Sequence, residues 1–325
     1  MRPLTWLIIG LLAVMGVAQS ASAEADVDFV ASLPLGDAAY AVAISPDGLL
    51  YVADIGGPRG WIFVFTQSGL LRERISIQAG PSGLVAPRAI VFDRLGNLYI
   101  ADAASGEPER GRILRIKPRG RPSVYASGLT MPTALAVDSS GVLYVADGRN
   151  GAVLWIGPDG ASASFVEDER LLPRTRSGVG ASGLAFAPDE SALYLTNFDD
   201  ERLLRLTINP DGSAGRLSTL ATSADFRGPG QRTGILDGPT GLAVDDQGNI
   251  LVAAHRSNQI QSFTPRGHLL GRVPSSGGSL LANPTTLALA DRRVYVANLG
   301  LEQGLSHVSR FWLSELYRDD GERGS

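Results

Sequence analysis

The sequence predicts an all-β protein, a six-bladed β-propeller of four-stranded antiparallel blades, and two observations support this prediction. A short motif recurs six times, written YVAD, YIAD, YVAD, YLTN, LVAA and YVAN. The last residues of successive copies are separated by 44 residues at the least (254 to 298) and by 57 at the most (197 to 254). In addition, no segment combines a helical period with helix caps. A period of about 40–50 residues that holds several short strands is typical of a propeller, in which one blade cannot bury both of its faces alone.

Each repeat contains four short apolar segments, which the third copy writes as ALAVD, VLYVA, AVLWIG and SASFVE. Such β-branched runs are typical of blade strands. A tight turn, such as Pro46–Gly48, separates the first two segments, where glycine tolerates the positive φ that short hairpins require. We expect the innermost strands to begin near Ala41, Ala89, Ala134, Gly183, Gly241 and Thr286.

The sixth repeat contains only three strands and ends at Ser306–Leu313. The missing outer strand is expected at the other end of the chain, because the sequence from Asp28 parallels the sequence from Pro122. We therefore predict that the first mature strand completes the last blade and closes the ring. This closure removes two exposed sheet edges.

The N-terminus resembles an export signal, which defines the domain boundaries. Arg2 supplies a positive start, Leu4–Val17 is apolar, and Ala21–Ala23 is a small-residue cleavage site. The alternative is a membrane anchor, but a run of 14 residues (4 to 17) is shorter than the roughly 20 needed to span a bilayer. We expect a signal peptide at residues 1–23, one propeller domain at 24–317 and a flexible tail at 318–325. The product is expected to be periplasmic or secreted.

Composition excludes several functional classes. The 325 residues include no cysteine, so disulfides, thiolate nucleophiles and thiolate metal sites are impossible. A net charge of −4 provides no basic field for nucleic acid. No later segment is apolar enough to span a membrane, and we expect a monomer.

Two segments resemble the closing blades of the SMP-30/gluconolactonase/luciferin-regenerating family. They are Gly238–Val273, which begins "GPTGLAVDDQGNILVAAH", and Asn283–Asn298, "NPTTLALADRRVYVAN". Ser182–Asn197, "SGLAFAPDESALYLTN", resembles the family's middle blade, and the single repeats are similar to NHL repeats. The resemblance covers nearly all of the mature chain. It implies a six-bladed propeller and, for the members that hydrolyse lactones, one divalent cation such as calcium on the axis.

The resemblance also implies where the cation ligands lie, at the starts of the innermost strands. The family's first-blade glutamate falls at or near Tyr40, its "N-G-L-A" asparagine at Ser182 and its "P-D-G" aspartate at Thr240. The complete axial ring is predicted to be Tyr40, Arg88, Thr133, Ser182, Thr240 and Thr285. This ring has no carboxylate, whereas calcium takes six to eight oxygens that usually include carboxylates. We therefore expect neither metal nor other cofactor, with Asp237 as the nearest alternative ligand.

Other polar residues have competing interpretations. His255 follows a second strand, where it would be either a general base or, as we favour, a solvent-exposed loop residue, and His268 and His307 are interpreted as surface residues. We expect turn capping rather than metal binding from the motif-ending residues Asp54, Asp102, Asp147, Asn197 and Asn298. The arginines of the two longest blade connections could bind an anion together with Arg88. They are Arg170, Arg174, Arg176, Arg227 and Arg232. Acidic residues interleaved with them favour a solvated surface instead.

These observations favour an exported binding propeller that lacks the family's metal site. Its ligand would be a small polar or anionic molecule, or else a protein or polymer partner. The alternative is an enzyme, a lactone or ester hydrolase with an altered site, which would keep a divalent cation. No catalytic residue can be assigned from the sequence.

Overall fold

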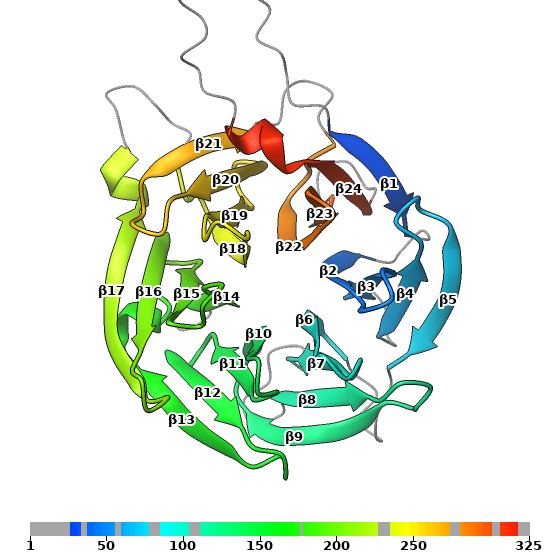
Figure 1. Cartoon of the computed structure of the whole chain (residues 1–325), viewed down its shortest axis with the longest axis horizontal. Helices are drawn as coiled ribbons and strands as arrows, with labels where there is room; N and C mark the ends of the chain where they lie inside the picture. The colour runs from blue at the N-terminus through cyan, green and yellow to red at the C-terminus, as the bar shows by residue number, and fades with distance from the viewer. Residues whose placement is uncertain are drawn as a thin grey trace, which may run out of the picture.

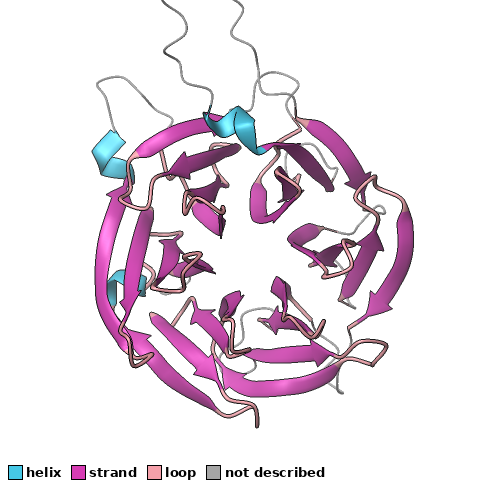
Figure 2. Cartoon of the chain, in the orientation of Figure 1, coloured by secondary structure: helices cyan, strands magenta, loops and turns pink. Residues whose placement is uncertain are grey.

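The computed structural model describes residues 27–33, 38–55, 60–77, 85–103, 111–175, 178–226, 235–273, 280–300 and 306–317. The predicted signal peptide and the predicted tail lie outside these residues. Figure 1 shows six sheets arranged as blades around a central axis. Strands make up most of the described chain, with only short helical turns at the periphery (Figure 2). The predicted six-bladed propeller is confirmed.

The first three blades each run outward in chain order from the axis. Blade 1 consists of β2 (Ala39–Ile44), β3 (Leu50–Asp54), β4 (Trp61–Phe65) and β5 (Leu71–Ser76). Blade 2 consists of β6 (Pro87–Phe92), β7 (Leu98–Asp102), β8 (Gly111–Ile116) and β9 (Ser123–Leu129). Blade 3 consists of β10 (Pro132–Val137), β11 (Leu143–Asp147), β12 (Ala152–Ile156) and β13 (Ser162–Glu167).

The last three blades include the closing one. Blade 4 consists of β14 (Ala181–Phe186), β15 (Ala192–Asn197), β16 (Arg202–Ile208) and β17 (Ala214–Thr222). Blade 5 consists of β18 (Pro239–Val244), β19 (Ile250–Ala254), β20 (Gln259–Phe263) and β21 (Leu269–Val273). Blade 6 consists of β22 (Pro284–Ala290), β23 (Arg293–Asn298), β24 (His307–Trp312) and β1 (Asp28–Ser32). Short 3₁₀ helices follow at Glu169–Leu171, Ser223–Phe226 and Leu313–Tyr317.

The ring closes as predicted, with the N-terminal strand β1 as the outer strand of blade 6. β1 pairs antiparallel with β24, from Asp28 opposite Arg310 to Ser32 opposite His307. Figure 1 shows the two strands side by side. Beyond β24 the chain remains packed: Leu316 is fully buried, and the Tyr317 hydroxyl donates a hydrogen bond of 2.6 Å to Asp245 in blade 5. The described propeller therefore extends through residue 317.

The core lies between the blades rather than at the axis. Each of the six blade junctions contains its own cluster of buried side chains. Between blades 1 and 2, for example, Tyr51 packs edge-on against Phe92, and between blades 3 and 4 Tyr144 packs in the same way against Phe186. Because a blade is buried only by its neighbours, the six repeats form one cooperative structure.

The polar residues that end the recurring motif bond to backbone groups near the blade entries, as the capping interpretation expects; the copy in blade 5 ends in Ala254 and has no such side chain. The Asp54 carboxylate accepts from the Ala38 N–H at 2.7 Å, and Asp102 accepts from the Ala86 N–H at 2.8 Å. These N–H groups belong to the segment leading into the innermost strand, and not only to the following turn. The capped segments fix where each innermost strand begins, and so they position the axial residues.

Candidate axial site

A β-bulge near the start of every innermost strand turns one residue toward the axis. In blade 1, Ala39 pairs with Asp54 and Ala41 with Ala53, so Tyr40 has no partner in the ladder. The same shift in register recurs in the other five blades. A bulge re-aims the side chain of the extra residue. The strands begin about two residues before the predicted starts, which makes each predicted ring residue the second residue of its strand.

The six predicted ring residues lie together around one cavity of about 140 Å³. Phe198 and Leu299, which the sequence reasoning missed, also line it, and so does His255, for which that reasoning favoured an exposed loop over a general base. Each of these three directly follows the last residue of the recurring motif, in blades 4, 5 and 6. Repeat alignment could have identified them, because they occupy one repeat position. Farther along the axis a smaller space of about 70 Å³ is lined mainly by alanine, glycine and branched apolar residues of the innermost strands.

Four of the six ring residues use their hydroxyl groups to join neighbouring blades. Thr133 Oγ1 donates to the Ala181 carbonyl at 2.7 Å, and Ser182 Oγ donates to the Pro239 carbonyl at 2.8 Å. At the next two junctions, Thr240 Oγ1 lies 3.2 Å from the Pro284 carbonyl as well as 3.1 Å from the Ala253 carbonyl of its own blade, and Thr285 Oγ1 donates to the Tyr40 carbonyl at 2.6 Å. A hydroxyl has a single hydrogen to donate. These inter-blade hydroxyls therefore hold the ring together and are not free to donate to a ligand.

Arg88 and Tyr40 form the other side of the ring. Arg88 Nη1 donates to the Tyr40 hydroxyl at 3.2 Å, and its guanidinium lies 5.6 Å from the centre of the Tyr40 ring. Arg88 Nε is buried and has no hydrogen-bond partner. Among the described residues no carboxylate or carbonyl pairs with Arg88. A half-buried cation without a counter-charge costs free energy.

His255 faces the cavity, which corrects the interpretation as a solvent-exposed loop residue. It is half-buried, packs edge-on against Phe198 and has its Nδ1 3.2 Å from the Pro284 carbonyl. Nδ1 is therefore the protonated nitrogen of the neutral ring, because the carbonyl only accepts. Burial lowers the pKa of His255 below its ordinary value of 6.5, and the nearby Arg256 acts in the same direction. The imidazole is neutral at pH 7.

Other sequence-predicted residues lie away from the cavity. Asp237 is 3.9 Å from Arg256 and does not line the cavity. Two of the connection arginines are paired with acids, Arg170 with Asp168 and Arg174 with Asp200, so they do not receive an anion here. Arg176, Arg227 and Arg232 lie outside the described residues.

The two remaining histidines differ from one another. His268 is exposed, as predicted. His307 is buried, with Nε2 2.7 Å from the Leu280 carbonyl, which corrects its interpretation as a surface residue. It belongs to β24, which β1 covers from outside, and closure of the ring is what buries it.

The described lining does not fit the divalent cation that the family resemblance implies. It offers hydroxyls, a phenol, an imidazole and a guanidinium, with no carboxylate. No group of three or more His, Asp or Glu side chains suited to a metal occurs in the part of the chain that the structure describes. Calcium needs anionic oxygens to balance its charge, and Arg88 would repel it.

Comparison with known proteins supports the family resemblance. Residues 158–297 match the model of the SMP-30/gluconolactonase/LRE-like region. The chain is 30% identical to a gluconolactonase of Zymomonas mobilis over 31% of its length and 28% of that protein. It is 24% identical to the lactonase drp35 of Staphylococcus saprophyticus over 46% of its length and 43% of that protein. The chain thus aligns with less than half the length of either curated relative.

Solved structures agree on the fold. A luciferin-regenerating enzyme superposes with a TM-score of 0.65, at 16% identity, over 88% of this chain and 94% of that one. At this identity the likeness shows the fold alone. The protein is thus a six-bladed propeller that is similar to the SMP-30/gluconolactonase family, with the matching residues in blades 3 to 6. Among the described residues no helix has the length and apolar character needed to cross a membrane.

Proposed function

We propose that the protein is an exported binding propeller whose axial cavity receives a small organic anion at Arg88. The observation that carries this proposal is the guanidinium itself, whose Nε is buried without a partner in a cavity whose described lining has no carboxylate. Arginine suits carboxylate and phosphate groups because its planar fork can donate two parallel hydrogen bonds.

The other residues of the cavity limit what the ligand can be. The inter-blade hydroxyls Thr133, Ser182, Thr240 and Thr285 offer lone pairs but no free hydrogens, so they favour hydroxyl donors on the ligand. Phe198, after β15 of blade 4, and Leu299, after β23 of blade 6, supply apolar contacts. A space of about 140 Å³ is smaller than the roughly 300–1,000 Å³ of drug-sized sites, so it would hold only a small anion or the head group of a larger molecule. Polyhydroxy acids combine these features.

Export is part of the same proposal. It is supported by the N-terminal sequence, with Arg2, the apolar run Leu4–Val17 and the small residues Ala21–Ala23. N-terminal sequencing of the protein recovered from the periplasm or medium tests it. The expected mature protein begins at Glu24, and an uncleaved chain that stays with the membrane fraction would contradict it.

Thermal melts in the presence of anions test ligand binding. We expect D-gluconate, a sugar phosphate or another small organic anion to raise the Tm of the wild-type protein, and neutral glucose to have no effect. In Arg88→Met this rise should disappear, whereas the exposed Arg266→Met should behave like wild type. If no anion raises the wild-type Tm, anion binding is wrong and a protein or polymer partner becomes the better hypothesis.

One observation favours a second candidate function, hydrolysis of a lactone. His255 is a neutral imidazole at the cavity, which suits a general base. It would take a proton from water as the water oxygen bonds to the lactone carbonyl carbon. The bond between that carbon and the ring oxygen would then break, and the ring oxygen would receive the proton.

Two measurements separate the candidates. Hydrolysis of gluconolactone above the background rate, abolished in His255→Gln, would support the enzyme. Melts with calcium and then chelator test for the family's cation. By mass action a site with micromolar affinity would gain about 4 kcal/mol at millimolar calcium, whereas we expect no rise in Tm. A large rise that chelator reverses would restore the metal-dependent hydrolase.

A further inference from the structure

A second unpaired arginine lies far from the axis, in a repeat position that allows an internal comparison. In three blades a tyrosine on the second strand lies opposite an arginine on the third strand. The pairs are Tyr99 with Arg115 in blade 2, Tyr194 with Arg205 in blade 4, and Tyr295 with Arg310 in blade 6. Because the backbone position is the same, differences between the three arginines arise from their surroundings.

Two of the three arginines have acidic or carbonyl neighbours. Arg310 lies 3.4 Å from the Asp28 carboxylate and donates to the Gln67 carbonyl at 2.9 Å. Arg205 lies near Asp189, whose pKa is lowered mainly by hydrogen bonds from Ser191 and further by this arginine. Arg115 has no ion pair, and its Nε is buried without a hydrogen-bond partner. Of the three, Arg115 is therefore the one with a buried donor that has no hydrogen-bond partner among the described residues.

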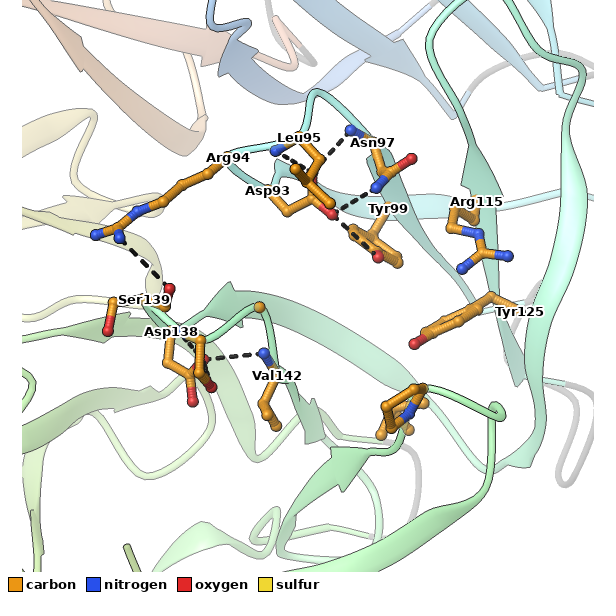
Figure 3. Close-up of a pocket in the computed structure, with 14 residues that line it drawn as sticks. Asp93, Arg94, Leu95, Asn97, Tyr99, Arg115, Tyr125, Asp138, Ser139 and Val142 are labelled. Carbon is orange, nitrogen blue, oxygen red and sulfur yellow. Dashed lines mark hydrogen bonds between the residues drawn. The ribbon is translucent and has the colours of Figure 1, made fainter.

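Arg115 faces a cavity of about 500 Å³ between blades 2 and 3. Its guanidinium lies over the Tyr125 ring at 4.5 Å, and Figure 3 shows it beside Tyr99. The stacking holds the guanidinium in place without neutralising it. The β6–β7 and β10–β11 turns line the cavity, so it opens at the ends of the innermost strands, away from the axial mouth.

The two carboxylates that line this cavity are already occupied. Asp93 is buried and accepts from the Leu95 and Asn97 N–H groups at 2.9 and 2.8 Å, and also from the Tyr99 hydroxyl at 3.2 Å. Burial and the neighbouring Asp93 raise the pKa of Tyr99 to about 12, so its hydroxyl stays protonated and donates. Asp138 caps its own turn by accepting from the N–H groups of Ser140 and Val142. Neither carboxylate pairs with Arg115.

The groove between blades 1 and 2 shows that size alone does not make this site. That groove has a similar volume of about 530 Å³. Its charged lining mixes the acids Asp47 and Glu73 with Lys117 and Arg119. In blade 1 the position of Arg115 is taken by Val64, opposite Tyr51. The cavity between blades 2 and 3 differs in having a stacked, unpaired guanidinium.

We propose that the cavity between blades 2 and 3 binds a small organic carboxylate with an apolar body. The carboxylate would accept from Arg115, and the apolar body would lie against Leu95, Val142 and Ile156, which line the same cavity. Leu95 is 80% exposed at the rim, where its side chain is available for apolar contact with a ligand. The volume lies within the range of small-molecule sites, about 300–1,000 Å³. This site is independent of the proposed axial function.

Benzoate titration followed by methyl NMR tests the proposal, with benzamide as the neutral probe of the same shape. Val142 and Ile156 report on this cavity, whereas Val179 and Leu299 report on the axial one. We expect benzoate to shift the Val142 and Ile156 signals and benzamide to bind at least tenfold more weakly. Arg115→Met keeps an apolar stem on Tyr125 and should weaken benzoate binding by roughly tenfold to a hundredfold, the range for a charged hydrogen bond.

The matched control is Arg205→Met, at the same repeat position in blade 4, which should bind benzoate like wild type. Leu95→Ser, at an exposed position, should weaken benzoate binding by about threefold to tenfold through lost apolar contact. The proposal is overturned if benzoate leaves the Val142 and Ile156 signals of wild type unmoved, or if Arg115→Met binds benzoate unchanged. Shifts confined to Val179 and Leu299 would also overturn it, while supporting the axial site.

Discussion

The axial ring divides into two parts, an inter-blade part of four residues and a part of two, which use one backbone position for different purposes. In blades 3 to 6 the bulge residue is Thr133, Ser182, Thr240 or Thr285, and its hydroxyl bonds to a carbonyl of the next blade. In blades 1 and 2 it is Tyr40 or Arg88, and Arg88 keeps a buried nitrogen without a partner. The difference teaches that a short hydroxyl side chain closes a blade junction, whereas a long polar one leaves chemistry available in the cavity.

The residues packed around the inter-blade part of the ring can be replaced only at a cost in packing. An added Cβ at Gly148 would lie 2.7 Å from the Ala181 carbonyl oxygen and 2.7 Å from the Thr133 methyl group. Glycine there lets Thr133 approach the next blade. The side chains of this inter-blade part pack closely against the neighbouring backbone. We therefore expect substitutions there to affect stability rather than binding.

The largest loss of stability is expected from deleting β1, the outer strand of blade 6. Deleting residues 24–33 would remove the β1 ladder and the buried Val30, Ala31 and Leu33. Several ladder bonds at about 1 kcal/mol each, together with the apolar burial, amount to at least about 5 kcal/mol. Urea unfolding should show a protein that is unfolded or close to it.

Deletion of residues 318–325, the predicted tail, is the control for that truncation and should unfold like wild type. If the protein without residues 24–33 unfolds at the wild-type urea concentration, β1 does not hold the ring closed.

The next largest effect is the stability lost when a single inter-blade hydroxyl is removed. Thr285→Val keeps the shape of a side chain that is 1% exposed but removes the donor to the Tyr40 and Ala297 carbonyls. Loss of a buried donor should lower the free energy of unfolding by about 1–3 kcal/mol. Thr219→Val, at an exposed position of β17, should change it by less than about 0.5 kcal/mol. Equal effects of the two substitutions would mean that the inter-blade hydroxyls carry no stability.

The smallest effect is a pH dependence from His255, which follows β19 in blade 5 and contacts blade 6 through the Pro284 carbonyl. Its pKa is below 6.5 in the folded state, so the unfolded chain takes up the proton first as the pH falls. Stability should therefore be complete above about pH 6.5 and decrease as the pH falls through that value. His255→Gln should flatten the slope of unfolding free energy between pH 7.5 and 5.5, and the exposed His268→Gln should not. A slope that His255→Gln leaves unchanged would contradict the burial of a neutral imidazole.

The repeat predicted the fold, because a propeller imposes its period on the chain. The period predicted six blades, and the strand missing from the sixth repeat predicted closure by β1; both predictions are confirmed. The six predicted ring residues line one cavity, and their role in binding a ligand stays a prediction. The orientation of His255 and the burial of His307 could not be predicted in this way. His255 points inward because the turn after β19 carries it to the cavity, and His307 is buried by a strand from the other end of the chain. Hydrogen bonds from ring hydroxyls to carbonyls of the next blade also depend on blade spacing, which no local pattern reports.

Urea unfolding of Arg88→Met, beside wild type and Thr285→Val in a buffer of low ionic strength without organic anions, tests the division of the ring most directly. If Arg88 is held for a ligand, replacing it removes an under-paired buried charge, and the free energy of unfolding should equal or exceed that of wild type. Thr285→Val should lose about 1–3 kcal/mol in the same buffer. A loss for Arg88→Met as large as that for Thr285→Val would show that Arg88 holds the ring together as the hydroxyls do, and would contradict the account.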